Sequence, residues 1–322
     1  MYQNQLLNQL QNELPKNTSL NEAIATALDI SYDAAHRRSS LKSKFSIDET
    51  IRLSKYYNIS LDRLFEVNDE HLICVEKTRP IHSESDLKEY FDSSCESLKP
   101  LLNQNESRIL YSAKDIPLFY TLENNLLSRF KMYVWLKLLD SNLATKGFDT
   151  FSLSVSTLES AKNLGSLYKN LNTSEIWDLT TVNSTLKQIH FYNQAGRLSD
   201  ATALQLCKDL KALIVYISGN VKADDLSYQL YYNELLLMNN NVLVCTPSEK
   251  SLFVPFTILS YFQTADKITC QQADAFLSKQ LQSSKLLNSA GEKEKLTFFN
   301  KIYAKIDALY QIIEASQVLD FE

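Results

Sequence analysis

Apolar residues recur at intervals of three and four positions through the first 65 residues, and this spacing is typical of α-helices with one buried face. The first such stretch covers residues 3–14, with Leu6, Leu7 and Leu10 on one face, and Pro15 ends it. Four shorter stretches follow, over residues 20–28, 32–39, 47–57 and 61–65. The pattern therefore predicts five consecutive helices at the start of the chain.

Serine side chains precede the later stretches, where a hydroxyl oxygen can accept a hydrogen bond from a backbone N–H of the first helical turn. Ser19 and Ser46 are each followed three positions later by a glutamate, Glu22 and Glu49, and this spacing predicts a capping box. Ser31 is predicted to cap the third helix. The caps indicate that short turns separate the helices.

A polar segment, residues 69–84, interrupts the periodic pattern and contains Pro80, so we predict a linker there, although its HLICV stretch could form a short strand. In residues 228–256, apolar runs such as VLVCT and KSLFVPF alternate with polar turns, which favours two or three antiparallel strands. The helical spacing is found elsewhere in this part of the chain, over residues 85–102, 122–139, 153–171, 174–194, 199–217, 270–282 and 292–313.

Length and composition agree with this division. A chain of 322 residues exceeds the usual size of one hydrophobic core. The content of only 5 Gly and 6 Pro favours long helices over a turn-rich all-β fold. We therefore expect a mainly α protein. A five-helix N-terminal domain would cover residues 1–68, and a helical connector with a mostly helical C-terminal domain, containing a small antiparallel β-sheet, would cover residues 85–322.

The charge and the cysteines narrow the function classes. A net charge of −5 argues against a protein that coats nucleic acid through bulk positive charge, so any DNA contact must be local. The five cysteines are far apart and show no paired spacing, which is typical of reduced thiols in a cytoplasmic protein. The first residues show no signal-peptide pattern, and no apolar run is long enough for a membrane span. We expect a cytoplasmic protein.

Motifs for catalysis and for metal binding are missing from the sequence. The four histidines are scattered, and none stands at metal-ligand spacing with a cysteine or a carboxylate. The chain contains no G-x-S-x-G and no Gly-rich phosphate loop. We therefore expect no cofactor, no bound metal and no enzymatic activity.

The second and third predicted helices carry the residue types of two helices that cross closely after a sharp turn. Ala25 lies on the first of them, Leu28 and Ile30 flank the turn, and Ala34 and Ala35 lie on the second. A helix-turn-helix requires such residues at this spacing. Here the stretch LNEAIATALDISYDAAHRRSSLKSKFSIDETIRLSKYYNISLDRLF resembles the lambda-repressor-like (XRE-type) family of bacterial helix-turn-helix regulators, including the ISLDRLF ending typical of their last helix.

The turn departs from the family at one position. The family usually places Gly between the two helices, whereas this chain has Asp29. Aspartate is among the residues that tolerate a positive φ, at a strain of about 1 kcal/mol. We expect the turn to be kept.

The resemblance implies that the third helix enters the major groove of double-stranded DNA. Arg37 or Arg38 could then contact a guanine through two hydrogen bonds. Residues 31–55 contain six basic and three acidic residues, so a local charge of +3 lies where DNA would bind. The expected contacts come from the third helix, from the lysines of the following loop, and from the start of the fourth helix, where backbone amides can hold a phosphate: Ser31, Tyr32, Asp33, His36, Arg37, Arg38, Lys42, Lys44 and Ser46.

The whole chain resembles a group of helix-turn-helix proteins common in Bacteroidetes, through AKDIPLFY, FKMYVWLK, EIW, YYNELLL and SSKLLNSAGEKEKLTFFNKI. No particular activity comes with this resemblance. One domain of this kind neutralises few phosphates, so we expect a homodimer. The C-terminal domain would supply self-association and would sense a small-molecule or protein effector, because it is much larger than dimerisation alone requires.

Two other functions stay open at this point. The N-terminal domain could serve protein contacts only, as an interaction module that has lost DNA binding. An enzyme would need convergent polar residues in one cleft of the C-terminal domain. Glu234, inside the apolar run YYNELLL, could hold a cationic group of a ligand, although a strand residue that faces solvent or pairs with Lys or Arg explains it as well.

Overall fold

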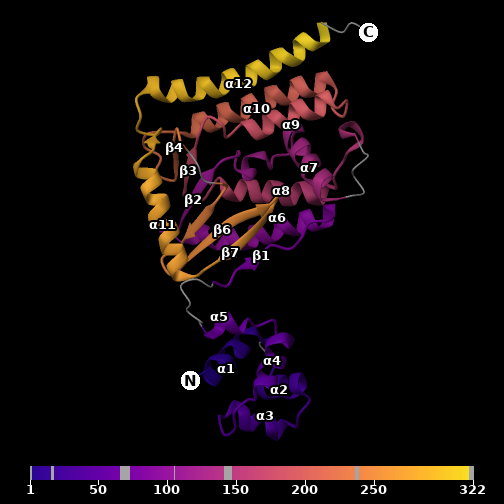
Figure 1. Cartoon of the computed structure of the whole chain (residues 1–322), viewed down its shortest axis with the longest axis vertical. Coiled ribbons are helices and arrows are strands. Elements are labelled where there is room, and N and C mark those ends of the chain that lie inside the picture. The colour runs from indigo at the N-terminus through magenta and orange to yellow at the C-terminus, as the bar shows by residue number, and fades with distance from the viewer. Residues whose placement is uncertain are drawn as a thin grey trace. The chain divides into compact units, whose positions relative to one another are not determined.

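The computed structural model describes residues 2–15, 18–65, 73–104, 106–140, 147–235 and 239–318. The chain divides into two compact units, Met1–Cys74 and Val75–Glu322, each with its own hydrophobic core (Figure 1). The division lies inside the segment predicted as a linker. Residues 69–72 of that segment, with the first two residues of HLICV, lie outside the described residues, and residues 73–75 form no strand.

The described part of the N-terminal unit consists of helices that share one core. Leu10, Ile24 and Leu53 from three different helices are completely buried in it. The Tyr57 hydroxyl donates a hydrogen bond to the Ala23 carbonyl at 2.9 Å, which ties the end of the fourth helix to the second. The helices are α1 (Tyr2–Glu13), α2 (Leu20–Leu28), α3 (Tyr32–Ser39), α4 (Ile47–Tyr56) and α5 (Leu61–Phe65).

The helix caps follow the sequence pattern in two of three cases. Ser46 and Glu49 form the predicted capping box at the start of α4. The Ser31 hydroxyl accepts a hydrogen bond from the Ala34 amide at the start of α3, also as predicted. The prediction for Ser19 was wrong, because its side chain makes no capping hydrogen bond, although its backbone has the extended conformation of a cap residue.

The C-terminal unit contains one eight-stranded mixed sheet with the strand order β1-β7-β6-β5-β2-β3-β4-β8. Strands β2, β3 and β4 are parallel to one another, and the remaining pairs are antiparallel. The strands are β1 (Glu76–Lys77), β2 (Arg108–Ala113), β3 (Thr173–Trp177), β4 (Tyr228–Tyr232), β5 (Val242–Cys245), β6 (Lys250–Thr257), β7 (Ser260–Thr264) and β8 (Lys285–Leu286).

The expected small antiparallel sheet was therefore wrong in size and in strand direction. The predicted helix over residues 174–194 was also wrong in its first part, which is β3. Strands β2 and β3 are buried on both faces, so their sequences show no alternation of apolar and polar residues. Antiparallel pairing of β5 with β6 agrees with the expectation for residues 228–256.

Helices cover both faces of this sheet, and the expectation of a mainly α protein with a sheet is confirmed. Tyr111 and Trp177 belong to the larger core, and Leu110 and Ile176 belong to the smaller core, to which α11 contributes Cys270 and Leu277. The α-helices are α6 (Glu84–Leu98), α7 (Leu126–Leu139), α8 (Val155–Tyr168), α9 (Asn183–Gln194), α10 (Asp200–Asn220), α11 (Lys267–Gln282) and α12 (Glu292–Val318). Short 3₁₀ helices are η1 (Lys99–Asn103), η2 (Leu118–Thr121) and η4 (Phe148–Thr150).

Neither a membrane-spanning helix nor a metal-binding cluster is found among the described residues. None of the helices in the described ranges combines the length and the apolar character that a membrane crossing needs. Among the same residues, no group of three or more His, Cys, Asp or Glu side chains could hold a metal ion.

Candidate nucleic-acid interface

A sharp turn of three residues, Asp29, Ile30 and Ser31, separates α2 from α3. Asp29 has φ 56° and ψ 51°, the left-handed conformation, and its amide donates a hydrogen bond to the Ala25 carbonyl. The Ile30 amide donates to the same carbonyl at 3.1 Å. Ala35 on α3 is completely buried, so the two helices approach closely there. The backbone at Asp29 thus has the positive φ that the sequence predicted.

The outer face of α3 is open to solvent. Ser31, Tyr32, Asp33, His36 and Arg37 are exposed, and Tyr32 retains 53% of its accessible surface. Within the described ranges, the side chains of His36 and Arg37 have no hydrogen-bond or ion-pair partner. Because these two side chains of the last turn of α3 have no partner there, they can make new contacts without breaking old ones.

Asn21 of α2 makes hydrogen bonds to two residues of α3. Its Nδ2 donates a hydrogen bond to the Tyr32 hydroxyl at 3.1 Å, and its Oδ1 accepts one from the Ser39 hydroxyl at 2.5 Å. One amide side chain therefore links both ends of α3 to α2. The hydrogen bond to the Tyr32 hydroxyl links this exposed side chain to α2.

Arg38 is turned inward and is bound within the unit. Its guanidinium donates two hydrogen bonds to the Glu49 carboxylate, Nε to Oε2 at 3.1 Å and Nη2 to Oε1 at 2.5 Å, and Nη1 donates to the Ala34 carbonyl at 3.0 Å. The hydrogen bond from Arg38 lowers the pKa of Glu49, against the opposing effect of burial. The expected use of Arg38 as a base-reading residue does not fit this geometry, because the guanidinium already joins α3 to α4.

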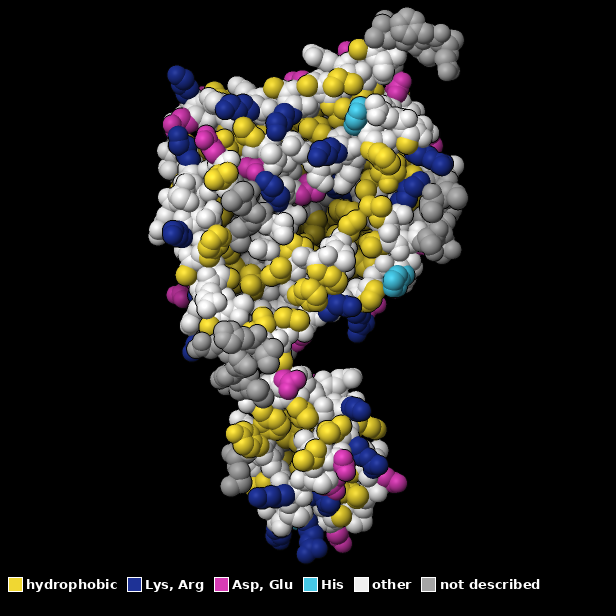
Figure 2. Space-filling view, in the orientation of Figure 1, with side chains coloured by type: hydrophobic (Ala, Val, Ile, Leu, Met, Phe, Trp, Pro, Cys, Tyr) yellow, Lys and Arg dark blue, Asp and Glu magenta, His cyan; other side chains and the backbone are white. Residues whose placement is uncertain are grey.

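The loop between α3 and α4 carries Lys42 and Lys44, and both are exposed. Ser46 does not offer its amide to a phosphate as expected, since this N–H donates to the Glu49 carboxylate at 2.9 Å. Lys and Arg side chains gather at the end of the N-terminal unit that carries α3 (Figure 2). Of the nine expected contact residues, Arg38 and the Ser46 amide are bound within the unit, and the remaining side chains are exposed: Ser31, Tyr32, Asp33, His36, Arg37, Lys42 and Lys44.

No family model, curated protein or solved structure matches this chain. The resemblance to lambda-repressor-like regulators therefore stays a prediction from the sequence.

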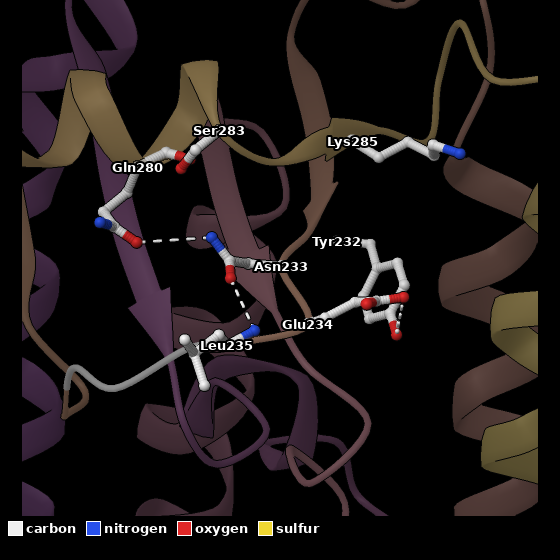
Figure 3. A pocket seen from close by; sticks show the side chains of 7 residues that line it. All are labelled: Tyr232, Asn233, Glu234, Leu235, Gln280, Ser283 and Lys285. Atoms are coloured by element: carbon white, nitrogen blue, oxygen red, sulfur yellow. Dashed lines mark hydrogen bonds between the residues drawn. The ribbon is translucent and has the colours of Figure 1, made fainter.

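Glu234, which the sequence offered as a residue that could hold a cationic group, lies just beyond the end of β4 and not inside a strand. It is exposed, and the Tyr232 hydroxyl donates a hydrogen bond to its Oε1 at 3.5 Å. Both side chains line an open pocket of about 520 Å³ with Asn233, Leu235, Gln280, Ser283 and Lys285 (Figure 3). Lys285 points away from Asn233 and Gln280 and pairs with Glu294 at 2.6 Å. Exposure to solvent, the simpler of the two interpretations, agrees with this position.

A buried carboxylate in the C-terminal core was not predicted from the sequence. Glu175 on β3 has no exposed surface, and burial raises its pKa to about 7 despite the opposing hydrogen bonds. Its Oε1 accepts from the hydroxyls of Tyr168 at 2.7 Å and Tyr120 at 2.8 Å, and its Oε2 accepts from Trp177 Nε1 at 2.9 Å and from the Tyr228 hydroxyl at 3.3 Å. The sequence signal for this buried carboxylate was the position of Glu175 directly before the apolar residues Ile176 and Trp177.

Proposed function

We propose that this chain is a cytoplasmic transcriptional regulator that binds double-stranded DNA and inserts α3 into the major groove. The observation that carries the proposal is the open face of α3, where His36 and Arg37 are exposed and have no partner among the described residues. A helix that presents free hydrogen-bond donors beside a basic loop suits the edges of base pairs and the flanking phosphates.

Each exposed residue has a role in this proposal. Arg37 donates two hydrogen bonds to a guanine, and His36 contacts a neighbouring base. Tyr32, held by Asn21, touches a thymine methyl group or a phosphate. Lys42 and Lys44 contact phosphates, which position the helix without reading sequence.

The resemblance of residues 20–65 to lambda-repressor-like regulators supports the same function. A helix-turn-helix of this kind acts as a dimer on two half-sites about one helical turn of DNA apart. We propose that the chain forms a homodimer through its C-terminal unit and that this unit responds to a small-molecule or protein effector.

Selection of bound fragments from the source genome by the purified full-length protein tests the proposal. A regulator enriches a small set of fragments with a shared, two-fold symmetric motif, and its affinity falls steeply with salt. An interaction module that has lost DNA binding enriches no fragment and elutes from immobilised DNA at low salt, which would refute the proposal.

A further inference from the structure

The loop between α3 and α4, residues 40–46, is bound by one side chain from α1, which lies far from it in the sequence. Gln3 on α1 uses its whole amide for this contact. Its Nε2 donates hydrogen bonds to the carbonyls of Arg38 and Ser43, both at 2.9 Å, and its Oε1 accepts one from the Phe45 amide at 3.3 Å. The three hydrogen bonds span the loop from the last turn of α3 to the residue before the α4 cap.

The loop does not have the conformation that its own residues favour. Leu41 has φ 62°, in the left-handed region that branched apolar residues rarely adopt. The Ser43 hydroxyl oxygen is buried and finds no hydrogen-bond partner in the described part of the chain. The amides of Ser40, Leu41 and Ser43 donate hydrogen bonds to carbonyls of the last turn of α3, and these bonds close the first part of the loop. Gln3 binds the second part of the loop, through the Ser43 carbonyl and the Phe45 amide.

The held segment carries the basic side chains. Lys42 and Lys44 are exposed on either side of Ser43, whose carbonyl is bound by Gln3. The position of the Ser43 peptide therefore sets where both lysine stems leave the backbone.

We propose that Gln3 is a positioning residue for a phosphate-binding loop, which it holds in a form that lets Lys42 and Lys44 contact the phosphates of a DNA backbone. This proposal rests on the proposed function. Because phosphate contacts carry no sequence information, Gln3 controls the affinity for every sequence equally, whereas Arg37 controls the preference between sequences.

The test compares Gln3→Met with Gln5→Met in the full-length protein. Gln5 is an exposed residue of the same helix whose side chain makes no hydrogen bond in the described part of the chain, so it is a matched control. The probes are a selected genomic fragment and a duplex of random sequence, each titrated over a series of salt concentrations. We expect Q3M to weaken binding to both probes by the same factor and to make the slope of log affinity against log salt shallower by up to about 1.8, since each lost phosphate contact is worth about 0.9. Q5M leaves both values unchanged.

A double-mutant cycle separates positioning from a general effect on folding. In a K42A/K44A background, the lysines that Gln3 positions are gone, so Q3M should cause no further loss of affinity. An equal loss in both backgrounds, or an unchanged salt slope for Q3M, overturns the proposal. Gln3→Asn, whose amide is one methylene shorter, gives a second variant and should reproduce the loss. If the wild-type protein binds neither probe, the proposed function itself fails, which is a different outcome from wild-type binding that Q3M leaves unaltered.

Discussion

The side chains of Arg38 and Glu49 form a two-pronged ion pair that joins α3 to α4. Both side chains are only 20% exposed, so solvent screens the pair incompletely. Arg38→Ala should therefore lower the free energy of unfolding of the N-terminal unit by about 1 to 2 kcal/mol. Thermal denaturation followed by circular dichroism measures this loss. Tryptophan fluorescence serves as the control, because Trp135 and Trp177 both lie in the C-terminal unit, and its transition should not move.

The same pair makes the N-terminal unit sensitive to acid. The hydrogen bond from Arg38 lowers the pKa of Glu49 below its usual value of 4.5. A carboxyl whose pKa is lower in the folded state contributes stability above the unfolded pKa, and this stability is lost as the pH falls through the folded pKa. The stability advantage of the wild type over Glu49→Gln should thus be full at pH 7 and shrink as the pH falls below 4.5. A stability difference that stays constant down to about pH 2.5, roughly two units below the usual pKa of Glu49, would contradict a stabilising charge on this carboxyl.

Arg37 and Arg38 should behave differently although they are neighbours. Arg37→Ala should weaken binding to a selected DNA fragment by about 1 to 3 kcal/mol and leave the melting temperature unchanged, because its exposed side chain makes no hydrogen bond or ion pair in the described structure. Fluorescence anisotropy with labelled fragments measures the loss. Arg79→Ala, which removes an 85% exposed arginine from the C-terminal unit, controls for the change in net charge. Equal losses for the two variants would mean that Arg37 acts only through charge.

The left-handed conformation of Asp29 gives a test of the turn itself. Glycine adopts this conformation without strain, whereas alanine has a Cβ and lacks the polar side chain that helps Asp to tolerate it. Asp29→Gly should therefore be more stable than Asp29→Ala by about 1 kcal/mol. Denaturation of the two variants under the same conditions measures this difference in the free energy of unfolding. An alanine variant as stable as the glycine variant would argue against a left-handed conformation of residue 29.

Glu175 should make the C-terminal unit less stable as the pH rises. Burial raises its pKa from 4.5 to about 7, so the folded state binds more protons than the unfolded state between these values. Its contribution is present below pH 4.5 and is lost as the pH rises through about 7. The loss amounts to up to about 3 kcal/mol. Urea denaturation followed by tryptophan fluorescence measures the loss at about pH 5, near the lower of the two pKa values, and at about pH 8, roughly one unit above the higher one.

Glu175→Gln is the matching control for that experiment, since it keeps the shape of the side chain and cannot ionise. The slope of stability against pH should largely disappear in this variant. A wild-type unit that is equally stable at both pH values would show that the four donated hydrogen bonds outweigh burial and keep the carboxylate charged.

The N-terminal elements could be predicted because their signals are local. The spacing of Leu6, Leu7 and Leu10 and the pairing of Ser46 with Glu49 depend on residues within one or two helical turns of each other. The role of Gln3 could not be predicted in this way, because its three partners lie at least 35 residues away in the sequence. Exposure of Arg37 and engagement of Arg38 also depend on where α4 packs, which periodicity does not reveal.

The sheet was harder to predict for a different reason. Parallel strands that are buried on both faces lose the alternation that marks a strand, so RILYSA and TSEIW carried no clear signal. Antiparallel β5 and β6 are separated by a short turn, which gives a local signal. Because long connections separate β2, β3 and β4 in the sequence, no local sequence signal indicates the order of these strands in the sheet.

The role of α3 as a recognition helix is tested by a ratio of two affinities, measured with the full-length protein at physiological salt. One affinity is for a selected genomic fragment, and the other is for a scrambled duplex of the same composition. A sequence-reading α3 predicts a ratio on the order of 1,000 or more, and Arg37→Ala should reduce that ratio while Lys42→Ala leaves it unchanged. A ratio near 1, or no binding to either duplex, would contradict the assignment of α3 as a recognition helix.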